Sequence, residues 1–516
     1  MSSTIAGATI HYTSDGSTPT AASPVYTGPI VLAPSQTTAE EFQAIVVASG
    51  YLQSTLTTSS FVITLPQGVL AQATVSTTPI MTIPPNFMGL STDWMTASEI
   101  MGQASTGVNQ TYRTLLGNLT QYYTAPLLFR IEGDDTTVAD LQQDIEPLVE
   151  LSQAQSIHYT LGVDLMNDNL SVAEAEASAW TNGIPNNVIE AIEIGNEPDN
   201  YPYQSARPST YSFSDYLAEF QQWQQGIQST IGTGIGMMGP SSAQSGWKPS
   251  EESALTAGAL TPSIVSQHAY LGGAAAGQTL PPDYLLQPAS ATQLPGDYAG
   301  YAATAHQVGR LFRMGEINSV GGGGAAGISN SFSSALWSVD IMFNYLVNGM
   351  DGVNWHSGQY TNYALYEFSS VSYQGTTSYT LNQVNPLYYG LLTFAQLAGR
   401  GASLLPVATM TDSNVSIWST IDKTSTVHMI VINKDEVNTG NVIINLPGYG
   451  AGTIRYLSAP SYTSTNGVTL GGQTFDGSTD GTIQGTLVTT TITGANGTFT
   501  LPSMPITTAA VIDFSK

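Results

Sequence analysis

Two glutamates that each follow a short apolar run are the residues of this chain best suited to chemistry. Glu197 lies in Ala-Ile-Glu-Ile-Gly-Asn-Glu-Pro at 191–198, and Glu316 lies in Leu-Phe-Arg-Met-Gly-Glu-Ile-Asn at 311–318. Each pattern predicts a β-strand that delivers a carboxylate into the loop after it. Hydrolysis of a glycosidic bond needs such a pair, because one carboxyl group must be protonated and the other ionised. We therefore expect the two glutamates to act together on one bond.

Eight apolar runs that alternate with helical patterns predict the elements that position both glutamates. Eight successive β-then-α units over about 300 residues are typical of a (β/α)8 TIM barrel, an α/β fold. Glu197 follows the fourth predicted strand, and Glu316 closes the seventh. Active sites of such barrels lie at the carboxyl ends of the strands, so both side chains are expected to face one cleft. The predicted strands are 87–91, 127–131, 159–164, 191–195, 234–239, 263–270, 312–316 and 352–356. Amphipathic helices are predicted between them, for example at 138–152 and 332–347.

Strand patterns of a different kind flank the barrel. Residues 403–516 alternate apolar and polar positions and are rich in Thr, Val and Gly, which predicts a β-sandwich domain. Residues 68–85 are expected to add strands to it. Residues 1–65 alternate in the same way between turn signals and predict a small all-β module. The expected domains are therefore 1–65, a catalytic barrel at 86–402, and 403–516 with strands from 68–85.

The charge balance excludes several classes of partner. Of the 516 residues, 37 are acidic and 11 are basic, which gives a formal net charge of −26 at pH 7. Phosphate binding needs a basic surface, so nucleic acid is excluded. The same shortage of Lys and Arg argues against binding to a membrane surface or to a heavily sulfated polymer. No apolar run approaches the length of about 18 residues that spans a membrane.

Cysteine is absent, and this excludes disulfides, zinc–thiolate sites and thiol nucleophiles. The residues after Met1 lack a basic region and an apolar core, so no signal peptide is visible and the start has the character of a segment boundary. Only 9% of residues are charged, and Ser, Thr, Gly, Tyr and Gln are abundant, as is common in secreted carbohydrate-active proteins. We expect a secreted or periplasmic protein that acts as a monomer.

The two glutamates can be given distinct roles. Glu197 is expected to be the general acid/base, with Asn196 placed to hydrogen-bond a sugar hydroxyl beside the scissile bond and Pro198 stiffening the loop. Glu316 is expected to be the nucleophile and must stay ionised. Arg130, at the end of the second predicted strand, can favour that ionised state.

The segment around Glu316 resembles the nucleophile region of glycoside hydrolase family 79, the β-glucuronidase and heparanase family. The similar series consists of Gly-Glu, Ser and a run of Gly within 315–325, followed by Ser-Asn-Ser-Phe at 329–332. The resemblance covers about residues 68–516, and it implies retention of configuration through a covalent glycosyl-enzyme at Glu316. Residues 1–65 resemble the small immunoglobulin-like module of chitobiases and other secreted glycosidases, without its usual first strand, so we expect a truncated module; a spacer without a binding role is the plainer alternative.

The family resemblance also implies residues that bind the sugar and orient the nucleophile. Asp93, after the first predicted strand, would bind hydroxyls of the terminal sugar, and Tyr270, after the sixth, would orient Glu316. The chain departs from the family at Gly321, where relatives often place an aromatic residue five positions beyond the nucleophile. The same positions have structural alternatives, a helix cap for Asp93 and barrel packing for Tyr270.

A site for the carboxylate of a uronic acid is implied in the same way. The backbone amides of Gly322 and Gly323 would hold it together with a tyrosine after the eighth strand, which is either Tyr360 or Tyr363. The glycine run lacks the Lys-Ser/Thr of a phosphate-binding loop, so nucleotide binding is not expected.

Other polar groups near the predicted strand ends have structural explanations. His268 and His356 lack a spaced carboxylate partner, and we interpret them as hydrogen-bonded site or core residues, not as metal ligands. The acidic group Glu132, Asp134 and Asp135 is explained by a loop and a helix N-cap before residue 138. No metal and no cofactor are expected, because a carboxylate pair performs the whole reaction.

The leading hypothesis is a retaining exo-β-glucuronidase that removes terminal β-linked glucuronic acid from a glycan or glycoconjugate by double displacement. A heparanase-like activity on sulfated chains would need cations along the cleft, and the chain has four lysines and seven arginines in total. One alternative is a related retaining β-glycosidase for neutral sugars, distinguished by the carboxylate pocket. The other is a non-catalytic carbohydrate-binding protein, against which the presence of both glutamates argues.

Overall fold

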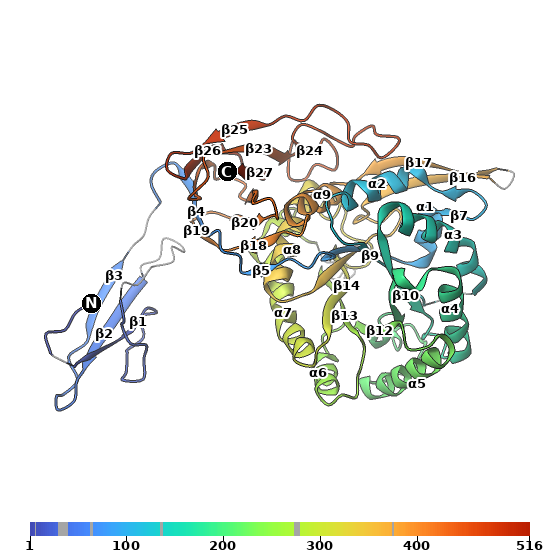
Figure 1. Ribbon diagram of the computed structural model, residues 1–516, viewed down its shortest axis with the longest axis horizontal. Coiled ribbons are helices and arrows are strands. Elements are labelled where there is room, and N and C mark those ends of the chain that lie inside the picture. Colours follow the sequence, from blue (N-terminus) through green and yellow to red (C-terminus); the bar gives the residue numbers. More distant parts are fainter. Residues whose placement is uncertain (6, 29–39, 62–64, 135–137, 273–278, 374–375) are drawn as a thin grey trace.

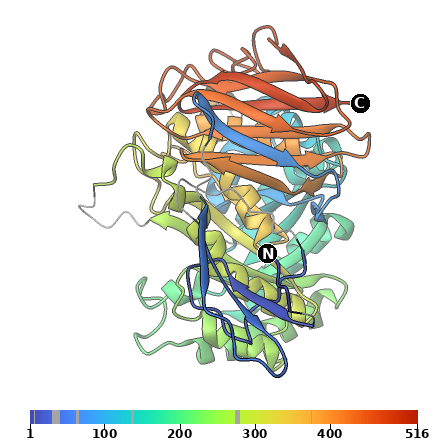
Figure 2. The same ribbon diagram turned by 90° about the vertical axis from the view of Figure 1, so that its left-hand side faces the viewer.

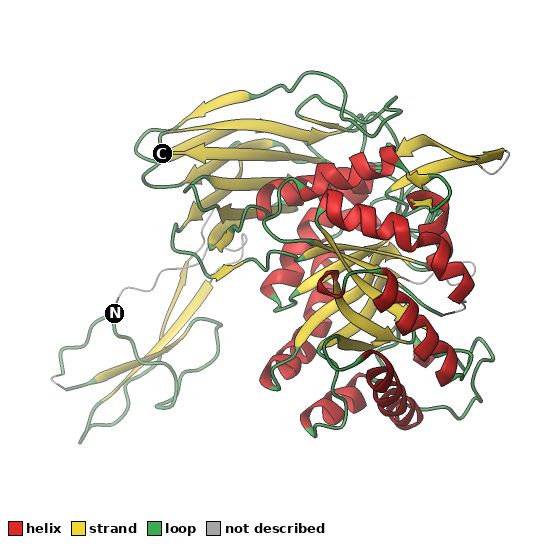
Figure 3. Cartoon of the chain, turned by 45° about the vertical axis from the view of Figure 1, so that its right-hand side comes forward, coloured by secondary structure: helices red, strands yellow, loops and turns green. Residues whose placement is uncertain are grey.

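The computed structural model describes the chain except residues 6, 29–39, 62–64, 135–137, 273–278 and 374–375. A barrel of parallel strands ringed by helices forms the body, and a layered β-domain that contains the C-terminus covers one side of it (Figure 1). A small three-stranded sheet at the N-terminal end stands beside them. The helices in Figure 3 surround the barrel strands, whereas the β-domain consists of strands and loops. The predicted fold class is confirmed.

Eight strands close into the barrel in the order β10-β11-β12-β13-β14-β15-β6-β9, with every neighbour parallel. Strands of such a barrel are covered on both faces, which explains their nearly continuous apolar runs. The predicted strands match these eight in order, and two of them, β9 and β15, have the predicted bounds. The strands are β6 Met88–Thr92, β9 Leu127–Ile131, β10 Ile157–Val163, β11 Ile189–Ile194, β12 Gly236–Ser242, β13 Ile264–Gly272, β14 Leu311–Val320 and β15 Gly352–His356.

The helices run between the barrel strands and pack on their outer side (Figure 1). They are α1 Trp94–Met101, α2 Gln110–Thr120, α3 Val138–Gln155, α4 Leu170–Gly183, α5 Phe213–Ile231, α6 Lys248–Thr256, α7 Pro288–Gln307, α8 Phe332–Val347 and α9 Pro386–Ala398, with short 3-10 turns η1 Asn186–Val188, η2 Pro198–Asn200 and η3 Tyr284–Leu286. Two small antiparallel pairs extend from the barrel loops, β7 Gly102–Gln103 with β8 Gly107–Val108 and β16 Tyr366–Tyr373 with β17 Thr376–Val384.

The prediction that the helix at 332–347 is amphipathic is wrong. Fourteen of its 16 residues are buried, because the barrel covers one side of α8 and the β-domain covers the other. Asp340 in the middle of α8 accepts hydrogen bonds from the Lys434 ammonium at 2.6 Å and from the Trp418 indole at 2.8 Å. Both partners belong to the β-domain, so a buried ion pair joins the two domains at this helix.

The β-domain is built from two sheets around an apolar core of their facing side chains. Its first strands, β4 and β5, come from the chain before the barrel, so the polypeptide enters this domain, forms the barrel and then returns. The larger sheet contains β5 Met81–Thr82, β18 Ser403–Leu405, β20 Val415–Ile421, β21 Val427–Asn433, β27 Thr508–Ser515, β23 Ala451–Ser458, β24 Thr469–Leu470 and β25 Thr490–Thr493. The smaller contains β19 Val407–Thr411, β4 Val69–Val75, β22 Gly440–Asn445 and β26 Thr498–Met504.

The N-terminal sheet is antiparallel and consists of β1 Thr9–Thr13, β2 Glu40–Val47 and β3 Thr57–Phe61. It lies toward the viewer in Figure 2, below the strands of the β-domain. Among the described residues, no helix combines the length and the apolar character needed to cross a membrane.

Candidate active site

Glu316 lies inside β14, where an extra residue aims its side chain into the barrel. The prediction that Glu316 closes its strand is wrong, because β14 continues to residue 320 and stays paired with β13. In that pairing Met314 faces Gln267 and Glu316 faces His268, so Gly315 is left without a partner residue. A Cβ atom at Gly315 would lie 2.2 Å from the side-chain oxygen of Ser266 on β13, so a larger residue would have to displace that side chain. Such bulges re-aim side chains beside active sites.

Positive and hydrogen-bonding groups surround the Glu316 carboxylate, whose side chain is 8% exposed. The Arg130 guanidinium donates to Oε2 at 2.8 Å, and the Tyr270 hydroxyl donates to Oε1 at 2.5 Å. Nδ1 of His356 and Nδ1 of His268 lie 3.5 and 3.8 Å from Oε2. Burial alone would raise the pKa of Glu316, but His356, His268, Arg130 and Tyr270 together hold it well below its usual range. Glu316 is therefore ionised.

Glu197 sits at the turn between β11 and η2, with left-handed backbone angles of φ 48° and ψ 54°. Its N–H donates to the Ser241 carbonyl at 3.1 Å, which fixes the turn against β12. Its Oε2 accepts from the Asn200 amide at 2.7 Å, and its Oε1 lies 3.1 Å from Nδ1 of His268. The side chain is 20% exposed, more than that of Glu316. Glu197 is thus the more accessible of the two carboxyl groups.

His268 links the two glutamates. One oxygen of Glu197, one oxygen of Glu316 and a ring nitrogen of His268 all lie within 4.8 Å of one another. Among the described residues, these three form the one group of His, Asp and Glu side chains compact enough to hold a metal ion. The expectation that the reaction uses no metal stays a prediction.

Arg130 is fully buried and connects several residues of this site through hydrogen bonds. Besides Glu316 it contacts Glu193, whose two oxygens accept from Nε at 2.9 and 2.8 Å. It also donates to the Asn196 amide oxygen at 2.7 Å and to the Ser91 hydroxyl at 3.0 Å. Burial alone would lower the pKa of Arg130, but Glu193 and Glu316 outweigh it and keep the guanidinium charged. Glu193 was not among the predicted site residues, although a charged residue inside an apolar run indicates a buried partner.

The structure distinguishes the two candidate tyrosines. Tyr363 is 6% exposed and stacks on Tyr270, with 6.0 Å between ring centroids. Tyr360 is 64% exposed, and its hydroxyl donates to the Phe368 carbonyl at 2.7 Å. Burial and Glu316 raise the pKa of Tyr363 to about 12 despite a nearby backbone N–H of Gly323, so its hydroxyl stays protonated. Tyr363, and not Tyr360, packs against the tyrosine that hydrogen-bonds Glu316.

The glycine run lies against the loop that carries Tyr363. Gly322 and Gly323 have φ angles of 69° and 89°, and the Gly323 carbonyl accepts from the Asn362 N–H at 2.7 Å. Gly321 donates its N–H to the carbonyl of Gly272, at the end of β13. The segments predicted to form a carboxylate pocket are therefore brought together.

Asp93 follows β6 and caps α1. Its two oxygens accept from the backbone N–H of Thr96 at 2.6 Å and from the Thr96 hydroxyl at 2.9 Å. The capping alternative is therefore observed, and a role of Asp93 in sugar binding stays a prediction.

A third carboxyl group, Glu132, comes directly after β9, the strand that carries Arg130. Burial and the charge of Glu316 raise the pKa of Glu132 well above the usual range, although Arg130 opposes the shift. Asp134 accepts from the Tyr201 hydroxyl and from backbone N–H groups, which stabilises the loop after β9. Asp135 lies outside the described residues. The electrostatic interaction of Glu132 with Glu316 was not predicted from the sequence.

Glu251 on α6 is a buried acid behind β12 and β13. It accepts from the Ser242 hydroxyl at 2.6 Å and from the Gln267 amide at 3.0 Å, and burial raises its pKa from 4.5 to about 8. The folded state keeps a proton that the unfolded state releases above pH 4.5, so this group lowers stability as pH rises toward 8.

We therefore expect the free energy of unfolding of Glu251→Gln to increase relative to that of wild type as pH rises from 5 to 8. The increase should reach about 4 kcal/mol. Thermal unfolding at a series of pH values measures the difference in Tm. Glu252→Gln, at the next position of α6, is the matched control and should show no such trend. A difference in Tm between Glu251→Gln and wild type that stays constant from pH 5 to pH 8 would contradict the raised pKa of Glu251.

Comparisons with known proteins agree with the predicted resemblance. Residues 417–507 match the model of the glycosyl hydrolase family 79 C-terminal beta domain, and residues 1–61 match the model named Fn3 associated. A β-glucuronidase of Aspergillus niger is 24% identical over 270 residues, which are 48% of this chain and 48% of that protein. The alignment thus spans about half the length of this curated relative.

Solved structures share the fold at low sequence identity. A 4-O-α-L-rhamnosyl-β-D-glucuronidase of Fusarium oxysporum has a TM-score of 0.68 and 18% identity, covering 86% of this chain and 99% of its own. A family 51 arabinofuranosidase of Xanthomonas axonopodis pv. citri has a TM-score of 0.63 and 12% identity, covering 87% and 100%. These likenesses concern the fold alone.

In its fold and in these relatives the chain is similar to glycoside hydrolases. The match of residues 417–507 to the family 79 C-terminal domain model confirms the resemblance seen in the sequence.

Proposed function

We propose that the chain is a retaining exo-β-glucuronidase that uses Glu197 as acid/base and Glu316 as nucleophile. The observation that carries this proposal is the spacing of the two glutamates, whose nearest oxygens lie within 4.8 Å. Retaining enzymes hold their carboxyl groups about 5–5.5 Å apart, whereas inverting enzymes leave about 6.5–9.5 Å for a water molecule. The spacing therefore favours direct attack by a carboxylate.

In the first step Glu316 attacks the anomeric carbon while Glu197 gives its proton to the leaving glycosidic oxygen. The bond to the leaving group breaks as the bond to Glu316 forms. In the second step Glu197 takes a proton from water, whose oxygen displaces Glu316 and releases the sugar. Arg130 and Tyr270 favour the carboxylate form of Glu316, which is the form that attacks and the form that leaves.

Recognition of a single uronate is supported by Tyr363, the adjacent glycine run and the name of the relative from Aspergillus niger. Arg130 is fully buried and bound to two glutamates, so it offers no free charge for a sulfated chain. An exo-acting enzyme for weakly charged glucuronides fits these features best. From composition alone, we place it outside the cytoplasm and as a monomer.

Tyr363→Phe is expected to raise KM and to lower kcat/KM for a β-glucuronide about 10- to 100-fold, because a hydrogen bond to a charged group is lost. Tyr360→Phe is the matched control and should leave both constants close to wild type, since its hydroxyl serves a backbone carbonyl. Steady-state kinetics on p-nitrophenyl β-D-glucuronide measure both. A larger loss for Tyr360→Phe than for Tyr363→Phe would overturn this choice of tyrosine.

The proposal is tested by nitrophenol release from p-nitrophenyl β-D-glucuronide and from the matching β-D-glucoside, with and without a chelator. Turnover of the glucuronide alone, unchanged by the chelator, is the expected result. Preference for the glucoside would favour a neutral-sugar glycosidase on the same barrel. No turnover of either by folded protein would favour a binding role.

A further inference from the structure

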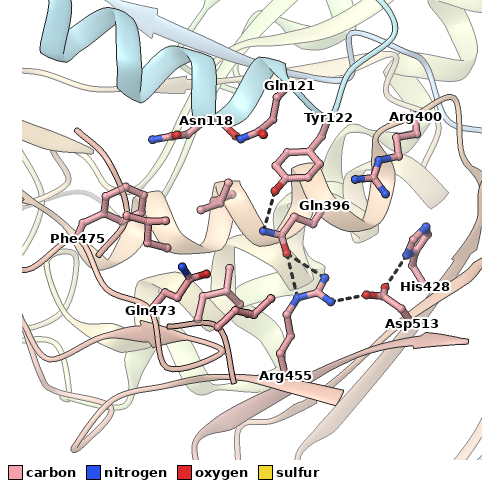
Figure 4. Close-up of a pocket in the computed structure, with 14 residues that line it drawn as sticks. Asn118, Gln121, Tyr122, Gln396, Arg400, His428, Arg455, Gln473, Phe475 and Asp513 are labelled. Carbon is pink, nitrogen blue, oxygen red and sulfur yellow. Dashed lines mark hydrogen bonds and ion pairs between the residues drawn. The ribbon is translucent and has the colours of Figure 1, made fainter. Parts of the chain in front are cut away.

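A polar cavity of about 270 Å³ lies where α2 and α9 of the barrel meet the larger sheet of the β-domain (Figure 4). None of its lining residues belongs to the candidate active site. Its volume is near the lower end of ligand sites, about 300 Å³, which suits a single sugar ring.

Two of the seven arginines of this acidic chain line the cavity, and one of them is already neutralised. Arg455 pairs with Asp513 and donates to the Gln396 side-chain oxygen at 3.1 and 2.9 Å. His428 contacts Asp513 at 2.6 Å. Burial opposes ionisation of Asp513, but His428 and Arg455 lower its pKa to about 2. The positive charge of Arg455 is therefore balanced.

Arg400 is the cation that remains available. It is exposed, its guanidinium carbon lies 5.3 Å from the centre of the Tyr122 ring, and within the described part of the chain it has no ion-pair partner. Its backbone has a φ of 57°, which is sterically unfavourable for arginine, and its N–H donates to the Tyr122 carbonyl at 2.6 Å. An uncompensated arginine is thus held in an unfavourable conformation at the cavity mouth.

The remaining lining combines apolar surface with side-chain amides. Phe475 is a buried residue of the lining. Gln473 donates its amide N–H to the carbonyl of Gly485, and its amide oxygen has no other partner within the described chain. A single cation beside hydrogen-bond acceptors and apolar surface suits a ring that carries one carboxylate and several hydroxyls.

We propose that this cavity is a second binding site, for a uronic acid residue of a glycan, with its carboxylate on Arg400 and its hydroxyls on the amides that include Gln473. The site is separate from the carboxylate pair and goes beyond the proposed function. It would hold a substrate chain on the enzyme without cleaving it.

Arginine side-chain NMR tests this directly, because seven arginines give a simple spectrum. Enzyme carrying ¹⁵N-arginine and Glu316→Gln is titrated with D-glucuronate, and Arg400→Gln assigns the Arg400 signal. Arg130 reports on the active site and Arg400 on the cavity, so each site is observed separately.

The expected result is a saturable shift of the Arg400 signal with glucuronate, none with glucose, and affinity reduced about tenfold or more by Gln473→Ala. Arg113→Gln, on helix α2 but outside the cavity lining, is the matched control and should leave this affinity unchanged. An Arg400 signal that does not move, or that inorganic phosphate moves with equal affinity, would overturn the proposal. A shift of Arg130 alone would refute the second site while leaving the proposed catalytic function standing.

Discussion

Replacing Glu316 with glutamine is expected to lower kcat on any β-glucuronide by about 10⁴-fold or more, because the amide cannot form the glycosyl-enzyme. The side chain keeps its size, and Arg130 keeps its pair with Glu193. The variant should therefore fold with a Tm close to wild type and still bind substrate.

The control for this prediction is chemical rescue. Glu316→Gly leaves space for azide, which would attack the anomeric carbon directly and yield an α-glucuronosyl azide from an activated substrate. Residual activity within about tenfold of wild type in folded Glu316→Gln, measured after removal of contaminating wild-type enzyme, would exclude Glu316 as the nucleophile.

Glu197→Ala is expected to depend strongly on the leaving group. A methyl or sugar leaving group needs a proton, so kcat/KM should fall about 10²- to 10⁴-fold. A nitrophenolate leaves without one, so kcat/KM on the aryl glucuronide should change far less. Steady-state kinetics on the two substrates separate these effects.

Azide provides the matching control, because it needs no general base to attack the glycosyl-enzyme. It should accelerate turnover of the aryl glucuronide by Glu197→Ala and yield a β-glucuronosyl azide. Asn200→Ala removes the amide that holds Glu197 and should cause a smaller loss on both substrates. Equal losses on both substrates, unaffected by azide, would contradict the acid/base role.

The barrel was predictable because its signals are local and repeated. Each buried parallel strand appears as a short apolar run, and eight of them alternate with helical patterns. The burial of helix α8 was not predictable in this way, because it depends on a domain formed by distant residues, including Lys434, which is 94 positions from Asp340. A helix that is covered on both sides needs no polar face, so the expected amphipathic pattern does not apply to it.

The site was predictable in its residue types and less so in its geometry. The glutamates stand out by their position after apolar runs, but the bulge at Gly315 depends on a close approach to β13 that the sequence does not reveal. The choice of Tyr363 over Tyr360 likewise depends on how one loop folds against another. Glu193 was overlooked because its partner, Arg130, is 63 positions away.

Proton NMR of the first sugar released from a β-D-glucuronide tests the proposed chemistry most directly. Spectra taken before mutarotation should show the β anomer of glucuronic acid first, with the α anomer growing later, as double displacement at Glu316 requires. Initial appearance of the α anomer would show inversion and would contradict a covalent role for Glu316.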